Sequence, residues 1–279
     1  MPSRIEIGAE SVRQMEISIR VAEQWAGRTL TIEDFSEDAV RRFLSEYRKT
    51  HSASTTNSKR CQLLALWRCA WEEDMLPNPP KARKIRRAKV SPAIPEAWSE
   101  SEVGRILDAT ANIKGTVAGI PASWWWESLI LAAYDTGERR KALLAVRPSD
   151  VSLSGPWIVF HSTKTKAPRW CPLSREAASA CARIYDKDRK TLWPWPCSRE
   201  WLDEQLRELC KAAGVRYGRV NGGLWHKIRR TCGTLVEANG GDGAKAIGNT
   251  RRVFERHYLD PRFIRDSEFH RLPRPVRSF

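Results

Sequence analysis

Several features that mark whole classes of proteins are absent from this sequence. It has no run of about twenty uncharged apolar residues, which is the length that a helix needs to cross a bilayer. The N-terminus carries Arg4, Glu6 and Glu10, where a secretory signal peptide requires an apolar stretch. We therefore expect a soluble, intracellular protein of the cytoplasm that has no membrane partner.

Cysteine is present, but without the spacing that would give it a structural or metal-binding use. No two cysteines form a Cys-x-x-Cys pair, and their number is odd: residues 61, 69, 171, 181, 197, 210 and 232. This excludes the usual zinc and disulfide frameworks, and we expect reduced, mostly buried thiols. The sequence also lacks a Gly-x-x-x-x-Gly-Lys-Ser/Thr loop, internal repeats and low-complexity tracts, so it shows no nucleotide-hydrolysing signature.

Acidic residues are fewer than basic residues. The chain has 48 Lys and Arg against 33 Asp and Glu, a formal net charge of +15 and a pI near 9.8. Its 279 residues and 41% hydrophobic content are sufficient for two domains with their own cores. A charge of this size suits a polyphosphate partner, although some basic proteins have no such partner.

The first third of the sequence reads as helices. Apolar residues recur at helical spacing from about residue 11 to 74, and Ser36 is a good N-cap for the second helix. The third helix opens on a polar, basic stretch from Ser54 to Arg60. Such a helix start can enter a DNA groove or be an ordinary solvated turn. The side chains that would reach phosphates or base edges are Thr56, Asn57, Lys59 and Arg60.

A basic linker is predicted at 77–97. Pro77 and the prolines after it should stop the third helix, and the following residues carry six positive charges and no acid. The run suits either contact with a DNA backbone or a solvated tether. Its candidate DNA-binding residues are Lys81, Arg83, Lys84, Arg86 and Arg87. Ser99 with Glu102 forms a capping-box pattern, so a second domain should start near residue 98.

The second domain, 98–279, is predicted to be mostly helical with a small β-sheet, which gives an α+β fold after the helical domain 1–88. The apolar helix that contains Trp124–Trp126 belongs in its core and ends at Gly137, which presents Arg139. Strands are expected at 157–160 and 169–172 around a hairpin tip. Further helices are expected at 175–187, 199–213 and 225–238.

Three short motifs carry the chemistry. They are Thr136-Gly137-Glu138-Arg139, His226-Lys227-Ile228-Arg229, and Gly248-Asn249 with Tyr258 nine residues after Asn249. Two arginines can grip the oxygens of one phosphodiester, a histidine can accept a proton, and a phenol can attack phosphorus. Each residue alone also fits an ordinary packing or surface role. The order and spacing of the motifs favour a phosphate-handling site.

These motifs resemble the two boxes of the tyrosine recombinases, or phage-integrase family. The first box of the family reads roughly Thr-Gly-x-Arg-x-x-Glu-Leu, and the second reads His-x-x-Arg, then Gly-His or Gly-Trp, then Tyr. Ala142 replaces the glutamate of the first box, and Asn249 replaces the histidine or tryptophan of the second. Between the boxes the family places a lysine on a β-hairpin, for which Lys164 is a better candidate than Lys166.

The resemblance implies a site-specific DNA recombinase or integrase that uses a 3′-phosphotyrosine intermediate and needs neither metal, ATP nor any other cofactor. Lys164 would protonate the leaving 5′ oxygen, and His226 would accept the proton of the tyrosine or orient the phosphate. The catalytic set would be Arg139, Lys164, His226, Arg229, Asn249 and Tyr258. The partner would be double-stranded DNA of the nucleoid, bound by a homotetramer that dissociates to a monomer or weak dimer.

The sequence leaves three further points open. The tail 262–279 would dock on a neighbouring protomer or on its own domain. Because Asn249 and Ala142 depart from the family pattern, we expect reduced or differently tuned activity. The competing functions are a DNA-binding accessory or regulatory protein that has lost strand exchange, and a type IB topoisomerase that relaxes supercoils as a monomer.

Overall fold

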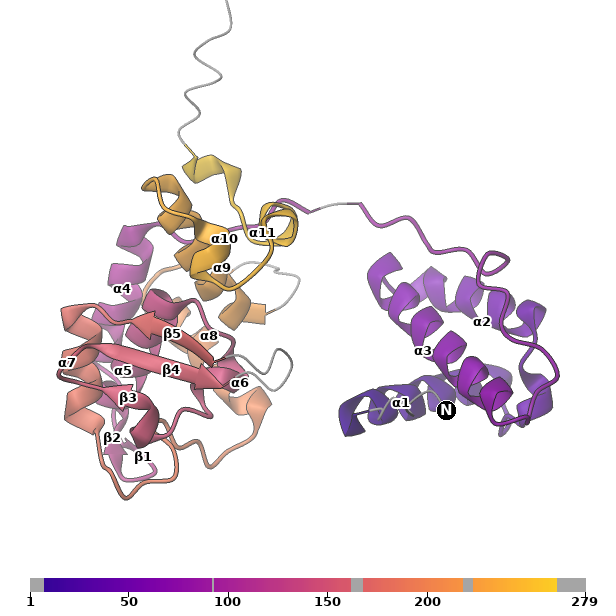
Figure 1. Ribbon diagram of the computed structural model, residues 1–279, viewed down its shortest axis with the longest axis horizontal. Helices are drawn as coiled ribbons and strands as arrows, with labels where there is room; N and C mark the ends of the chain where they lie inside the picture. Colours follow the sequence, from indigo (N-terminus) through magenta and orange to yellow (C-terminus); the bar gives the residue numbers. More distant parts are fainter. Residues whose placement is uncertain (1–7, 92, 162–167, 218–222, 265–279) are drawn as a thin grey trace, which may run out of the picture. The chain divides into compact units, whose positions relative to one another are not determined.

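The computed structural model describes residues 8–91, 93–161, 168–217 and 223–264. The chain divides into two compact units, Met1–Pro92 and Ala93–Phe279 (Figure 1). Both units are mainly helical, and the strands of the second form small antiparallel sheets. Within the described ranges, none of the helices combines the length and the apolar character that crossing a membrane requires.

The first unit is built from three helices around one core. Ser36 caps the second helix as predicted, because its hydroxyl accepts a hydrogen bond from the amide of Ala39 at 3.2 Å. Both α1 and α2 pack against α3, where Leu63 and Trp67 are buried with Phe43 of α2. The helices and a short 3-10 turn are α1 (Ala9–Ala26), η1 (Ile32–Asp34), α2 (Glu37–Thr50) and α3 (Ala53–Glu72).

The first part of the predicted linker belongs to this unit. Helix α3 ends at Glu72, before Pro77, and the chain turns at Asp74 with a φ of 57°. Ile85 is 1% exposed and completes the core of the unit, so the basic residues around it follow the surface of α3. Residues 77–85 of the predicted linker therefore pack on the first unit.

The second unit surrounds the apolar helix that the sequence predicts. Trp125 and Leu129 are fully buried and Trp126 is 2% exposed, whereas Trp124 is 40% exposed below the guanidinium of Arg183. Its elements are α4 (Glu100–Thr110), β1 (Thr116–Val117), β2 (Ile120–Pro121), α5 (Ala122–Thr136), α6 (Arg140–Leu143), η2 (Pro148–Asp150), β3 (Val151–Ser152), β4 (Trp157–His161), β5 (Pro168–Pro172), α7 (Arg175–Ile184), α8 (Arg199–Ala212), α9 (Gly223–Ala238), α10 (Gly243–Ala246), α11 (Arg251–His257) and η3 (Pro261–Phe263).

The predicted strands pair as expected. β4 and β5 are antiparallel, with Ile158 opposite Cys171 and Val159 opposite Trp170, and β3 extends the sheet on the other side of β4. Helix α5 packs against α7 and α9 (Figure 1). The helices predicted at 175–187, 199–213 and 225–238 are present, and each has one end shifted by one to three residues. The short elements α6, α10 and α11 were not predicted, because each is too brief to show a period.

Two glycines set the distance between α9 and α10. A Cβ atom on Gly243 would lie 2.2 Å from the carbonyl oxygen of Gly233, and one on Gly233 would lie 2.7 Å from the ring of Phe254. The backbones of the two helices therefore meet at these glycines. This contact places the turn after α10 beside α9.

Gly243→Ala is expected to destabilise the protein by at least about 2 kcal/mol, because the added methyl group overlaps a backbone oxygen that cannot rotate away. Gly104→Ala is the matched control. Gly104 lies within α4, and a Cβ atom there would meet nothing within 4 Å, so alanine should stabilise by roughly 0.5–1 kcal/mol. Urea unfolding of the intact protein measures both. Equal effects of the two substitutions would contradict this account of the α9–α10 contact.

Candidate functional site

The first motif forms the turn that ends α5. Gly137 adopts a φ of 57°, and a Cβ there would approach Ile247 to 2.7 Å and the sulfur of Cys232 to 3.0 Å. Only glycine fits this conformation without displacing a neighbour. The chain leaves the turn through Glu138 and reaches Arg139, which is exposed at the N-terminus of α6.

Arg229 of α9 holds this turn to a second one. Its side chain is 1% exposed, and its two Nη atoms donate hydrogen bonds to the carbonyl oxygens of Gly137 and Ile247. Burial lowers the pKa of the guanidinium, the nearby charge of Arg139 lowers it further, and Glu138 opposes the shift. Arginine remains charged in such surroundings. Arg229 is thus a fixed positive charge that joins the turns 136–138 and 246–249.

A second arginine, not predicted from the sequence, repeats this bridge one residue earlier in both turns. Arg169 of β5 donates through its Nη atoms to the carbonyl oxygens of Thr136 and Ala246, both at 2.6 Å. The carboxylate of Glu138 lies 3.0 Å from Nε of Arg169 and 3.9 Å from Nη1 of Arg229. One acid therefore compensates part of the charge of two arginines. The pattern of β5 alone gave no sign of this use.

His226 lies on α9, with its ring centroid 6.4 Å from that of Tyr258. Its pKa is lowered to about 4, mainly by burial and further by the positive charges of Arg230, Arg229, Arg139 and Arg140. The imidazole is consequently neutral at pH 7 and can accept a proton.

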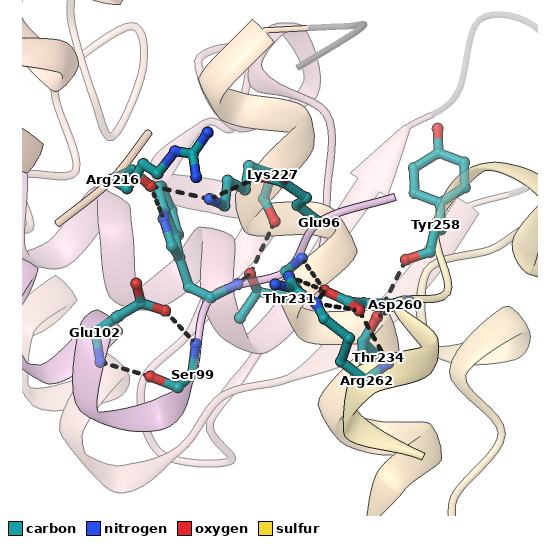
Figure 2. Close-up of polar contacts among 12 residues, drawn as sticks. Glu96, Ser99, Glu102, Arg216, Lys227, Thr231, Thr234, Tyr258, Asp260 and Arg262 are labelled. Atoms are coloured by element: carbon teal, nitrogen blue, oxygen red, sulfur yellow. Dashed lines mark hydrogen bonds and ion pairs between the residues drawn. The ribbon is translucent and has the colours of Figure 1, made fainter. Parts of the chain in front are cut away.

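Tyr258 is half-buried directly after α11. The guanidinium carbon of Arg229 lies 5.4 Å from the centroid of its ring. Its backbone is fixed at both ends, because its amide donates to Phe254 at 2.8 Å and its carbonyl oxygen accepts from the hydroxyl of Thr234 at 3.1 Å. Figure 2 shows the phenol pointing away from Thr234 and Asp260. The ring is thus held beside the buried arginine and the neutral histidine.

A cleft of about 720 Å³ opens at these residues. Arg139, His226 and Arg229 line it. Tyr258 is next to the cleft, because its ring contacts His226 and Arg229. Among the described residues that line the cleft, Asp203 is the one acid, and it is paired with Arg140. The further basic residues of the lining are Arg140, Lys141 and Arg199. The cleft is therefore strongly positive.

Three buried N–H groups around this cleft have no hydrogen-bond partner among the residues that the structure describes. They are Nε1 of Trp225, Nε of Arg229 and Nδ2 of Asn249. Trp225 and Arg229 line the cleft, and Asn249 follows Gly248, whose α-carbon faces the side chain of Arg169. All three groups are donors, and a buried unpaired donor costs about 1–3 kcal/mol. The site is therefore deficient in acceptors.

Two expectations concern residues outside this cluster. Lys164 and Lys166 lie outside the described residues, between the paired strands β4 and β5. Ala142, at the position of the family's glutamate, is half-buried in α6, and its side chain carries no charge. Among the described residues no group of three or more His, Cys, Asp or Glu side chains is arranged to hold a metal ion.

In the first unit, the predicted DNA-binding side chains of α3 make internal contacts. Lys59 is 7% exposed and donates to the hydroxyl of Ser18 at 3.2 Å, and burial lowers its pKa. The hydroxyl of Thr56 donates to Ser52, and Thr56 is 4% exposed. Both side chains are thus buried and take part in internal hydrogen bonds, and their contact with DNA stays a prediction.

Asn57 and Arg60 instead form hydrogen bonds with the backbone of the basic segment 81–89. The amide of Asn57 exchanges two hydrogen bonds of 2.8 Å with the backbone of Ala88, and Arg60 donates to the carbonyl oxygens of Ile85 and Ala82. These contacts leave six basic side chains of residues 81–89 exposed: Lys81, Arg83, Lys84, Arg86, Arg87 and Lys89. Of these, Lys84 is paired with Glu37 at 3.0 Å.

Arg86 and Arg87 face two exposed arginines of α2 that the sequence did not single out. Arg41 and Arg48 lie two helical turns apart and line a cleft of about 300 Å³ together with Arg86 and Arg87. Thr56, Asn57 and Arg60 also line this arginine cleft. The spacing of Arg41 and Arg48 was visible in the sequence, but their proximity to residues 86–87 depends on the fold of the segment.

The sequence matches no family model, and it matches no curated protein. Solved structures do match it. The chain is similar to a lambda integrase (75–356) dimer bound to a COC′ core site, with 17% identity and a TM-score of 0.68 over 99% of this chain and 94% of that one. It is also similar to XerH site-specific recombinase bound to palindromic difH substrate in a post-cleavage complex, with 17% identity and a TM-score of 0.68 over 92% and 78%.

A third similar structure is the Tn1549 transposon integrase in complex with a circular intermediate DNA. It shares 14% identity and a TM-score of 0.66, with 92% of this chain and 91% of that chain covered. At these identities the similarity concerns the fold and not the activity. The predicted resemblance is confirmed at this level: the chain has the fold of the tyrosine recombinases.

Proposed function

We propose that this protein is a site-specific recombinase that cuts and rejoins double-stranded DNA through Tyr258. The observation that carries the proposal is the set of unpaired N–H donors, among the described residues, beside a cleft lined with arginines. Phosphodiester oxygens are acceptors only, and they bring the negative charge that Arg139 and Arg229 can neutralise. The same two charges would stabilise the transition state, a role that metal ions fill in other phosphoryl-transfer sites.

The proposed step joins the phenolic oxygen of Tyr258 to phosphorus and breaks the bond from phosphorus to the 5′ oxygen. A phenol with a pKa near 10 is ionised to only about one part in a thousand at pH 7, so a proton acceptor is required. His226, whose ring centroid lies 6.4 Å from that of Tyr258, would fill this role. Lys164 would give a proton to the leaving 5′ oxygen. In the reverse step a 5′-hydroxyl attacks the phosphotyrosine, which conserves the energy of the bond.

The first unit would supply a second DNA-binding surface. In the arginine cleft the exposed side chains of Arg41, Arg48, Arg86 and Arg87 can each contact a phosphate, and such contacts position a protein on DNA without reading its sequence. The lambda integrase structures contain a dimer bound to a core site and a tetramer bound to a Holliday junction. By similarity we propose that four copies of this chain assemble on DNA.

An accessory DNA-binding protein of the same fold is the main alternative, because Asn249 and Ala142 stand where the family has larger polar or acidic groups. A suicide substrate, which traps the covalent intermediate, distinguishes the two functions. Adduct that requires Tyr258 supports the enzyme, and tight binding without adduct supports the accessory protein. Relaxation of a plasmid that has no specific site would favour a topoisomerase.

Tyr258→Phe is expected to abolish the covalent adduct, since no other group can replace the phenolic oxygen. Arg229→Ala should slow adduct formation at least about a hundredfold, because it removes a fixed donor to the transition state. Gel electrophoresis after denaturation measures the adduct on a suicide substrate. Tyr185→Phe, at an exposed tyrosine after α7, is the control and should retain the wild-type rate. Undiminished adduct in Tyr258→Phe would refute the proposed nucleophile.

The imidazole of His226 is expected to stay neutral in the folded protein from about pH 8 down to about pH 5. Its pKa falls from 6.5 to about 4 on folding, so the unfolded chain binds up to one more proton between these values. The neutral imidazole therefore contributes to the free energy of unfolding above pH 6.5. This contribution is lost as the pH falls toward 4, by at most about 1.4 kcal/mol per pH unit. NMR titration measures the pKa, with the signal assigned by its absence in His226→Gln. Titration near pH 6.5 in the folded protein would contradict the proposal.

The double variant Arg86→Gln, Arg87→Gln is expected to weaken DNA binding and to reduce its salt dependence. Each lost phosphate contact should lower the slope of log affinity against log salt by about 0.9. Fluorescence anisotropy at several salt concentrations measures both quantities. Arg20→Gln on α1 is the control, because Arg20 is exposed but does not line the arginine cleft. Identical salt slopes for the two variants would rule out this cleft as a phosphate-binding surface.

A further inference from the structure

Helix α9 presents two sets of polar residues to different parts of the unit. His226 and Arg229 face the cleft, while Lys227, Thr231 and Thr234 face the chain at 96–98 and 258–260 (Figure 2). The second set has the spacing of four and three residues that places side chains on one side of a helix. One rigid element therefore carries the catalytic side chains and also fastens other segments.

The segment at 96–98 is fastened at several points. The amide of Trp98 donates to the hydroxyl of Thr231 at 2.9 Å, and its indole N–H donates to the carbonyl oxygen of Arg216 at 3.1 Å. Lys227 donates to the same carbonyl oxygen at 2.9 Å and lies 5.2 Å from the ring centroid of Trp98. Trp98 is 2% exposed. These contacts fix Ala97, the residue before Trp98, relative to α9.

Asp260, two residues after Tyr258, is attached to this fixed segment. It is fully buried, and its carboxylate accepts the amide of Ala97 at 2.8 Å and the guanidinium of Arg262 at 2.6 Å. Burial alone would raise the pKa of this carboxyl, but the hydrogen bonds from Arg262 and Ala97 outweigh burial and lower the pKa. The group is therefore a charged, fully bonded acceptor in the interior.

Thr234 completes the connection to the tyrosine. Its hydroxyl accepts the amide of Asp260 at 3.0 Å and donates to the carbonyl oxygen of Tyr258 at 3.1 Å. Arg230, one turn earlier on α9, donates to the carbonyl oxygen of His257 at 3.1 Å. The backbone on both sides of Tyr258 is thus held by the helix that carries Arg229. The phenol itself takes no part in these bonds and remains available for chemistry.

We propose that Asp260 and Thr234 are positioning residues that hold the phenol of Tyr258 over Arg229 of the same chain. This inference rests on the proposed function, because it names residues that aim its nucleophile. Both side chains are fully buried and cannot touch DNA. Their loss should accordingly impair the chemical step and leave DNA binding intact.

The main test is Thr234→Val, which keeps the shape of the side chain and removes the hydroxyl. Thr110→Val is the matched control: Thr110 is 2% exposed in α4, and its hydroxyl donates to the carbonyl oxygen of Leu107. Adduct formation at saturating DNA should slow at least tenfold in Thr234→Val and stay at the wild-type rate in Thr110→Val. The DNA dissociation constant should change less than twofold in both. Wild-type rates in both variants would overturn the proposal.

Asp260→Ala and Asp260→Asn separate charge from hydrogen bonding. Asparagine keeps an acceptor for Ala97, so it should retain more activity than alanine. Asp135→Asn is the control, because the carboxylate of Asp135 also accepts a backbone amide, that of Ser174 at 2.7 Å, elsewhere in the unit. If Asp260→Ala does not fold, Thr234→Val decides the matter alone. Equal rates for Asp260→Ala and wild type would count against a positioning role.

Amide hydrogen exchange without DNA tests the same bonds independently of catalysis. The amide of Asp260 should exchange at least tenfold faster in Thr234→Val than in wild type or in Thr110→Val, since its acceptor is lost. If the wild-type protein forms no adduct, the proposed function fails, and exchange still reports whether Thr234 holds the segment. Unchanged exchange at Asp260 would overturn the inference whatever the adduct assay shows.

Discussion

The arrangement of the site depends on one buried guanidinium. Arg229 can occupy the interior of the second unit only because backbone carbonyl oxygens accept its Nη hydrogens, and the two that do so belong to turns far apart in the sequence. Gly137 and Ile247 are consequently brought to the same side chain. Arg169 repeats the bridge at the preceding residues, so each turn is held at two carbonyl oxygens. These two turns fix the backbone positions of Arg139 and Asn249.

Burial and the surrounding positive charge together explain the protonation state of the site. Burial contributes most to lowering the pKa of His226 to about 4, and the charges of Arg230, Arg229, Arg139 and Arg140 lower it further. A phosphodiester would reduce this positive charge when it binds. The same environment that keeps the histidine neutral therefore favours an anionic ligand.

Much of this structure could be predicted from the sequence, and the limits have physical causes. The apolar helix that ends at Gly137, the cap at Ser36 and the strands β4 and β5 follow from local pattern and turn chemistry. Arg169, Glu138 and Thr234 were missed because their partners are backbone atoms or distant side chains, which leave no local signal. The burial of Lys59 could not be predicted for a related reason: a polar helix start looks the same whether it faces solvent or another helix.

The two departures from the family pattern acquire a reason in this charge distribution. Glu138 already places one carboxylate between Arg169 and Arg229 and also accepts the amide of Arg139. A second carboxylate at Ala142 would reduce the positive charge that the proposed ligand requires. Asn249 keeps a buried N–H group without a partner among the described residues, so the position retains a donor although it has lost a ring. The substitutions therefore change how the proposed site is charged and shaped, and they leave its capacity to donate hydrogen bonds in place.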